Sequence, residues 1–165
     1  MPPVLNILVD PDVSHSLIFQ LDQYLFEVFS FNKIEVITSV TLPSSCWNKS
    51  RSQFDAACLL SFTTSFKSTE IVLLIISKDA YVSDLNFAFG VASRGLGAVV
   101  SVYRLENDPE FLQKEITHEL GHVFGLKHCS LPCVMTYSNS RSEARLKNRA
   151  FCQKCLKLIK RETCK

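Results

Sequence analysis

The chain has 165 residues, of which 47% are hydrophobic and 21% are charged, and its formal net charge at pH 7 is +2. This length suits one domain with a buried core, and this composition excludes a disordered chain. No apolar run is long enough to cross a bilayer, and the N-terminus lacks the basic start of a signal peptide, so we expect a cytoplasmic protein.

The first third of the sequence alternates strand and helix signals. A short buried strand is predicted over residues 4–9. From Ser14 to Val28, apolar residues recur every three or four positions, which predicts a helix. A β-branched strand over residues 34–42 and a helix over residues 50–60 follow.

Three more strands are predicted over residues 71–77, 86–93 and 98–105. The first is apolar throughout, which is typical of a strand covered on both faces. The short link SRGLG between the other two favours an antiparallel pair. This order predicts an α/β fold with a mixed sheet of about five strands, an antiparallel edge strand and flanking helices.

A longer helix is predicted over residues 109–124. Pro109 occupies its first position, where the missing N–H is tolerated, and Gly125 ends it, because glycine accepts a left-handed backbone. Four apolar residues at helical spacing form its buried stripe: Leu112, Ile116, Leu120 and Val123.

This helix contains the stretch HELGHVFGLKHC, with three of the four histidines of the chain. His118 and His122 are four residues apart and therefore share one helix face, and His128 can return to the same point beyond Gly125. Three imidazoles bind zinc and leave a fourth position open to water, as a catalytic site requires. Glu119, displaced around the helix, is placed to accept a proton from that water.

Four cysteines near the C-terminus predict a second zinc site, a closed structural one. Cys129 and Cys133 form a C-x3-C pair, and Cys152 and Cys155 a C-x2-C pair. The alternative, a redox dithiol in CQKC, is disfavoured because no thioredoxin-like unit precedes it. Cys164 remains as a free thiol or a substitute ligand.

The other two cysteines, Cys46 and Cys58, stand alone in the sequence. We expect all seven to stay reduced, and these two to be small buried hydrophobic residues. Because Cys129 follows His128 directly, we also expect the structural metal to hold the backbone that presents the third histidine.

The C-terminal residues 141–165 are basic, with nine Lys or Arg against two acids, a net of +7 that leaves −5 for residues 1–140. Such a segment raises the question of nucleic-acid binding, but it contains no recognition motif or interleaved aromatic residues. We expect a solvated basic face, and neither nucleic acid nor a membrane as a partner.

The sequence resembles the archaemetzincin family of metzincin-type zinc metallopeptidases. HELGHVFGLKHC, CVM and FCQKC carry the resemblance in this order, and NFAFG and VYRL are similar too. The resemblance implies a metzincin-like fold with a small zinc-bound C-terminal subdomain. It also implies Met135 as the floor of the metal site and the strand in NFAFGVAS as a peptide-binding edge, although an ordinary core strand explains NFAFGVAS equally well. In some other metzincins a tyrosine in the position of Tyr137 donates to the oxyanion, although turn packing explains Tyr137 equally well.

These observations predict a metallopeptidase with two zinc ions, one catalytic at His118, His122 and His128 and one structural at Cys129, Cys133, Cys152 and Cys155. Glu119 would be the general base, and peptides or proteins the substrates. We expect one domain over residues 1–165, with an upper region of residues 1–124 and a lower region of residues 125–165, acting as a monomer. The first strand begins almost at residue 1, so we expect no inhibitory pro-segment, which favours short peptides or N-terminal trimming. The alternative is a catalytically silent zinc protein that binds peptides or protein termini.

Overall fold

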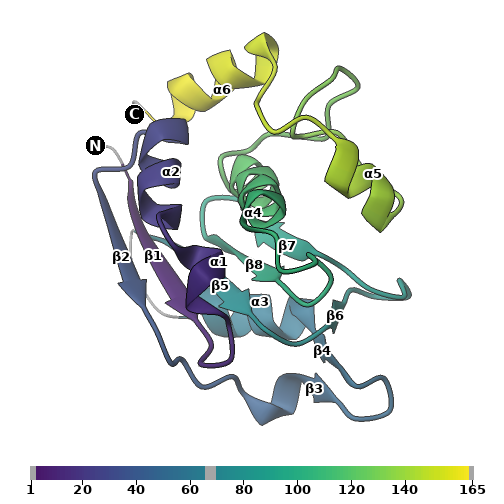
Figure 1. Ribbon diagram of the computed structural model, residues 1–165. Coiled ribbons are helices and arrows are strands. Elements are labelled where there is room, and N and C mark those ends of the chain that lie inside the picture. The colour runs from purple at the N-terminus through teal and green to yellow at the C-terminus, as the bar shows by residue number, and fades with distance from the viewer. Residues whose placement is uncertain (1–2, 66–69, 164–165) are drawn as a thin grey trace.

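The computed structural model describes residues 3–65 and 70–163 and has a twisted five-stranded sheet at its centre (Figure 1). The order across the sheet is β2-β1-β5-β8-β7. Its strands are β1 (Val4–Val9), β2 (Lys33–Ile37), β5 (Ile71–Ile76), β7 (Gly90–Ser93) and β8 (Gly97–Ser101). All neighbouring pairs are parallel except β7 and β8, which confirms a mixed α/β sheet with an antiparallel edge strand.

Strand β5 lies in the middle of the sheet, and all six of its side chains are buried. Alternate residues face opposite sides of a strand. Ile71, Leu73 and Ile75 accordingly join one hydrophobic cluster, and Val72, Leu74 and Ile76 join the other. The uninterrupted apolar sequence is therefore explained by helices that cover both faces, as expected.

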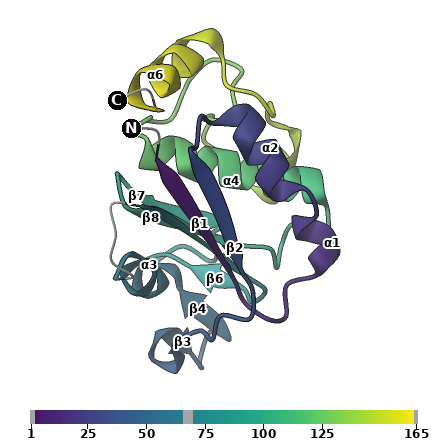
Figure 2. The same cartoon turned by 90° about the vertical axis from the view of Figure 1, so that its left-hand side faces the viewer.

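Helices cover the two faces unequally. Figure 2 shows α1, α2 and α4 on one side of the sheet and α3 on the other. The helices of this region of the chain are α1 (His15–Ile18), α2 (Leu21–Val28), α3 (Ala56–Thr64) and α4 (Pro109–Val123). The single helix predicted from Ser14 is broken in two, because Gln20 has a left-handed backbone with φ of 57°. The predicted helix over residues 50–60 begins late, at Ala56, where Asp55 caps its first turn.

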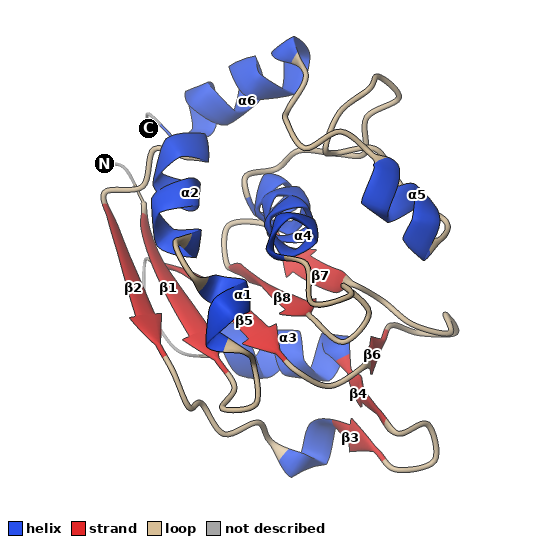
Figure 3. Cartoon of the chain, in the orientation of Figure 1, coloured by secondary structure: helices blue, strands red, loops and turns tan. Residues whose placement is uncertain are grey.

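A small second sheet of three strands was not predicted. Two of its strands come before α3 in the sequence and the third comes after it. Its strands are β3 (Trp47–Asn48), β4 (Gln53–Asp55) and β6 (Ala80–Tyr81). They are too short to show a periodic pattern in the sequence. The strand predicted over residues 86–93 is also shorter than expected, since only Gly90–Ser93 pairs with β8. Residues 86–89 are instead part of the loop that leads into β7 (Figure 3).

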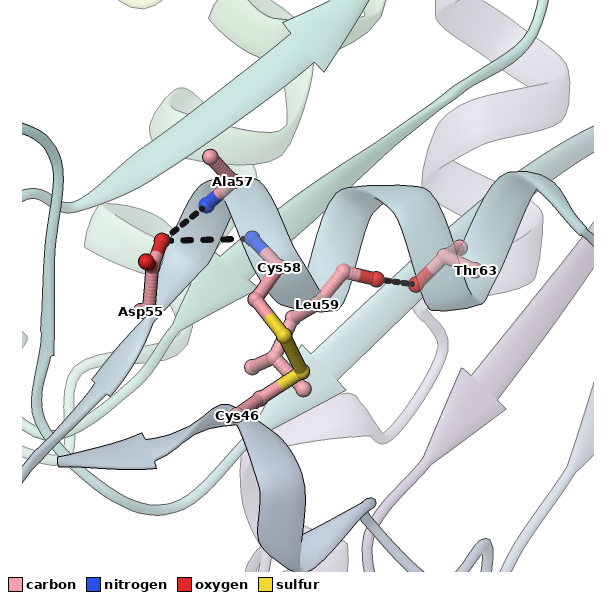
Figure 4. The surroundings of a disulfide bond; sticks show 6 residues. All are labelled: Cys46, Asp55, Ala57, Cys58, Leu59 and Thr63. Carbon is pink, nitrogen blue, oxygen red and sulfur yellow. Dashed lines mark hydrogen bonds between the residues drawn. A yellow bond between two sulfur atoms is a disulfide. The ribbon is translucent and has the colours of Figure 1, made fainter.

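Cys46 and Cys58 form a disulfide, so the expectation that both are separate reduced thiols is wrong (Figure 4). Cys46 ends η1 (Ser44–Cys46), a 3-10 turn, and Cys58 lies in the first turn of α3. Their Cα atoms are 5.4 Å apart, within the range that a disulfide needs. The small sheet brings the two together, and spacing in the sequence gave no sign of it.

The C-terminal region contains two helices that were not predicted, α5 (Arg141–Leu146) and α6 (Gln153–Thr163). Cys164 lies outside the described residues. Within residues 3–65 and 70–163, no helix has both the length and the apolar character needed to cross a membrane.

Candidate metal centre and cleft

Helix α4 positions the candidate site, and its sequence explains where it starts. The side chain of Asp108 accepts a hydrogen bond of 3.0 Å from the N–H of Glu110, and Pro109 follows the cap. Such a cap satisfies a backbone donor that the helix leaves free. The predicted stripe of Leu112, Ile116, Leu120 and Val123 is buried in the main hydrophobic cluster. The opposite face of the helix is therefore free to carry polar groups.

Gly125 turns the chain just beyond α4. Its φ is +90°, a left-handed conformation that side chains rarely adopt. The N–H of Gly125 donates to the carbonyl of His122 at 2.9 Å, and that of Leu126 donates to the carbonyl of Gly121 at 2.9 Å. These bonds satisfy the last carbonyls of the helix and direct His128 back toward it.

The three motif histidines lie together, as the spacing predicted. One ligand atom from each of His118, His122 and His128 lies within 4.8 Å of the others. The Nε2 atoms of His118 and His122 are 3.1 Å apart. Two Nδ1 atoms point away from this centre, that of His118 toward the carbonyl of Val134 at 2.8 Å and that of His122 toward the carbonyl of Leu126 at 2.8 Å. If each Nδ1 donates its hydrogen there, both Nε2 lone pairs remain for a metal ion.

The protonation of the histidines suits a metal site. Burial, reinforced by Lys147, lowers the pKa of His118 to about 3. Burial also lowers the pKa values of His122 and His128. Neutral imidazoles bind metal, whereas imidazolium ions do not. The donor set therefore fits a divalent zinc ion with an open coordination position.

Glu119 lies beside the histidines and is only 7% exposed. Burial raises the pKa of Glu119 to about 8, and nearby Glu115 acts in the same direction while Lys147 opposes both. A cation at the three imidazoles would favour the ionised carboxylate. Glu119 is thus a buried carboxyl group beside the histidines whose proton affinity a bound cation would lower.

The histidines and Glu119 open onto a cleft of about 450 Å³. Its wall on one side is the chain from Leu85 to Ala92, which includes the start of edge strand β7. The other side is formed by residues 137–140 and Lys147. The cleft therefore runs between the sheet edge and the segment that follows Met135.

Met135 is fully buried and packs against α4 at Gly121. A methyl group added at Gly121 would lie 2.4 Å from the sulfur of Met135 and 3.0 Å from its Cε. The glycine in HELGH therefore leaves room for the close approach of the Met135 side chain. This contact places Met135 under the histidine-bearing turns, as the family resemblance implied.

Tyr137 lies at the mouth of the cleft, where 54% of its surface is exposed. Its ring centroid is 5.1 Å from that of His128. The phenol ring thus lies beside a candidate metal-binding histidine and is partly exposed to solvent.

The four motif cysteines form the second cluster, with their sulfur atoms within 4.8 Å of one another. The backbone N–H of Cys155 lowers the pKa of Cys152 to about 7, whereas burial raises the pKa values of Cys133 and Cys155. The pKa values of these three thiols are therefore shifted in different directions. Four sulfurs in one place fit a tetrahedral zinc site.

Backbone contacts join the two clusters. The N–H of Cys129 donates to the carbonyl of Met135 at 3.0 Å, and the N–H of Met135 points to the sulfur of Cys133 at 3.5 Å. Between these residues, Val134 supplies the carbonyl that meets His118. The cysteine cluster thus fixes the segment that orients a histidine of the first cluster.

Two charged residues of the cleft were missed from the sequence. Glu115 and Lys147 form an ion pair of 3.1 Å beside His118. Glu115 lies four residues before Glu119 on the same helix face, and this spacing could have indicated it. Lys147 comes from beyond α5, and no local pattern marks it.

Comparison with known proteins gives consistent matches. A model of peptidase family M54 matches residues 28–161. The archaemetzincin of Nanoarchaeum equitans is 41% identical over 137 residues, covering 83% of this chain and 79% of that protein. The crystal structure of archaemetzincin from Methanopyrus kandleri superimposes with a TM-score of 0.89 at 34% identity, covering 99% of this chain and 97% of the other. That of a zinc-dependent peptidase from Methanocorpusculum labreanum gives a TM-score of 0.80 at 27% identity, covering 94% and 99%.

Proposed function

Because the chain belongs to peptidase family M54, the archaemetzincins, and is thus a zinc metallopeptidase, we propose that it hydrolyses peptide bonds with Glu119 as general base. His118, His122 and His128 would hold the catalytic zinc. The observation that best supports this assignment is the convergence of three neutral imidazoles on a cleft with a buried carboxylate beside them.

Zinc, when bound, supplies Lewis acidity toward the peptide carbonyl and toward water. Glu119 takes the proton from the attacking water and passes it to the leaving amine. The Glu119 side chain is buried against β7 at Gly90 and lines the cleft. Val134 and Leu126 fix the tautomers of two histidines through their carbonyls.

The substrate would lie extended along β7. This strand is half-buried, pairs with β8 on one side, and lies at the edge of the sheet and in the wall of the cleft. A peptide added to such an edge gains main-chain hydrogen bonds regardless of its sequence. Tyr137, exposed near His128, would donate to the oxyanion of the tetrahedral intermediate.

Cys129, Cys133, Cys152 and Cys155 would hold a second, structural zinc. With that ion the polypeptide functions as one catalytic domain over residues 1–165, in which residues 125–165 form the lower wall of the cleft. A cleft of about 450 Å³ suits short peptides or the N-terminal ends of chains better than folded proteins.

Glu119→Gln tests the proposal on a zinc-replete preparation with a mixed peptide library. Loss of the base should lower the cleavage rate on the order of 10²–10⁴-fold while zinc content stays the same. Mass spectrometry of the products measures both the rate and the cleavage position. Free amino acids released from N-termini would indicate an aminopeptidase.

Glu110→Gln is the matched control, because Glu110 lies on the same helix with its side chain 61% exposed. It should leave cleavage unchanged. If the wild-type protein binds library peptides but cleaves none, the alternative of a catalytically silent peptide-binding protein would replace the proposal.

A further inference from the structure

The residues that line the cleft include a buried ion pair that the proposed chemistry does not use. Lys147 Nζ lies 3.1 Å from Glu115 Oε1, and their side chains are 5% and 3% exposed. Both residues line the cleft together with His118 and Glu119. Lys147 also lies 3.4 Å from His118 Nδ1, but that nitrogen already faces the carbonyl of Val134 at 2.8 Å. The partner of the ammonium is therefore Glu115.

The protein holds this pair in place from both sides. Lys114, the neighbour of Glu115 on α4, donates to the carbonyl of Lys147 at 3.3 Å and to the carbonyl of Arg145. Lys114 thus binds the backbone of the segment after α5, and Glu115 binds the side chain of Lys147 in that segment. A buried ion pair contributes little net stability, because its desolvation offsets its attraction. Its fixed position at a cleft wall therefore suggests a role in recognition.

Two buried polar atoms of residues that line the cleft lack a hydrogen bond within the described residues of the chain. They are Glu115 Oε1, whose one contact is the ion pair with Lys147 at 3.1 Å, and Ser138 Oγ. Both residues line the cleft. Buried polar atoms of this kind normally have a partner, and a ligand group can supply it. The wall formed by residues 85–92 differs, because it contains Leu85, Phe87 and Phe89.

The charges of the pair decide which side chain fits. If an ammonium or guanidinium group of the substrate paired with Glu115, Lys147 would stay buried without a carboxylate partner. If a carboxylate of the substrate paired with Lys147, Glu115 would stay buried without a cationic partner. An unpaired buried charge is strongly unfavourable, so the pair disfavours side chains of either sign. An apolar side chain would leave the polar atoms without a partner.

We propose that Lys147 and Glu115 select a neutral amide side chain, Gln or Asn, of the substrate peptide. Its NH₂ group donates to Glu115 Oε1, and its carbonyl accepts from Lys147 Nζ, so the ion pair stays intact. Ser138 also lines the cleft, and its Oγ can form a hydrogen bond with either end of the amide. This inference rests on the proposed function, because it requires a peptide in the cleft.

Peptide binding to the zinc-loaded Glu119→Gln protein tests the selection without turnover. The probes are hexapeptides in a positional library, each with Gln, Met, Glu or Lys at the varied position. These four side chains are similar in length and differ in polarity and charge. At one position, Gln should bind at least about tenfold more tightly than the other three. Equal or tighter binding of Met at every position would overturn the inference.

Variants of the pair should change the preference in opposite directions. Lys147→Met leaves Glu115 unpaired and should favour Lys at that position, whereas Glu115→Gln leaves Lys147 unpaired and should favour Glu. Lys147→Arg keeps the pair and should keep the preference for Gln, which guards against a variant that fails to fold. An unchanged profile in the two charge-removing variants would overturn the inference.

The outcome separates selection from catalysis. Selective binding by Glu119→Gln with no cleavage by the wild-type protein would overturn the proposed hydrolysis and support the selection. Cleavage without preference for Gln or Asn would overturn the selection alone. Absence of binding to any peptide would overturn both.

Discussion

The histidine cluster and the cysteine cluster are adjacent in the chain, at His128 and Cys129, yet they are built for different tasks. The histidines offer three ligands at a cleft of about 450 Å³, with Glu119 beside them. The cysteines offer four ligands, and none of them lines that cleft. Three ligands leave a coordination position for a reactant, whereas four complete a tetrahedron. The number of ligands thus separates the candidate reactive site from the candidate structural site.

The comparison also shows that the two clusters share a backbone. Residues 129–135 belong to the cysteine cluster at one end and contact the histidine cluster at the other, through Val134 and Met135. A change in the closed cluster should therefore reach the open one.

Cys152→Ser should have the largest effect. It removes a ligand from the closed cluster, so the protein should lose that zinc equivalent. It should also weaken zinc at the histidines by about 10–100-fold, the usual effect of disturbing groups that orient a ligand. Zinc content and competition with a chelator measure both effects.

Ser130→Ala is the control for this change, because Ser130 is in the same loop and its hydroxyl is not one of the ligand atoms. Both zinc sites should remain intact in it. Loss of one equivalent from Cys152→Ser with unchanged affinity and activity at the histidines would show that the clusters are independent.

Residues that are close in sequence account for what could be predicted. The helix over 109–124, its turn at Gly125 and the gathering of the three histidines follow from spacing along one helix, and the helix ends within one residue of expectation. The cysteine cluster was recognisable because its ligands come in two close pairs. The apolar strand over residues 71–77 was predictable for the same reason, a pattern contained in one segment.

Contacts between distant segments account for what was missed. The Cys46–Cys58 disulfide depends on a small sheet whose strands have two or three residues, too few for a pattern. The Lys147–Glu115 pair depends on how the segment after α5 packs on α4. The break at Gln20 requires a left-handed backbone at a residue with no preference for it. In each case the structure depends on tertiary packing, which the local sequence pattern does not contain.

Gly121→Ala should have the next largest effect and should act on the histidine cluster first. The added methyl group would lie 2.4 Å from the sulfur of Met135, so the buried side chain of Met135, α4 or residues 133–135 must shift. Overpacking of this kind costs about 1–3 kcal/mol of stability. The shift should lower zinc affinity at the histidines while the cysteine zinc remains, which denaturation and zinc titration measure.

Met135→Ala in the same chain provides the matched test. It removes the sulfur that the new methyl group meets, so the double variant should be less destabilised than the sum of the two single variants. Additive effects would mean that Gly121 is required for some other reason.

The smallest expected effect concerns the charge of Glu119 when the histidine metal is removed by a mild chelator and the cysteine metal is kept. Burial raises the pKa of Glu119 to about 8, so between its ordinary value of 4.5 and about 8 the folded state binds a proton that the unfolded chain has released. Stability must then fall as pH rises through this window. From about pH 7 to pH 8, the wild-type protein should lose roughly 1 kcal/mol more than Glu119→Gln, since one pKa unit corresponds to about 1.4 kcal/mol. Restoring zinc should reduce this difference, because the cation favours the carboxylate in the folded state, and urea denaturation at the two pH values measures it. Equal pH dependence of the wild-type protein and Glu119→Gln, both without the histidine metal, would mean that Glu119 is already ionised without that metal. The histidine cluster would then not need a cation to ionise its carboxylate, and this electrostatic difference from the cysteine cluster would not hold.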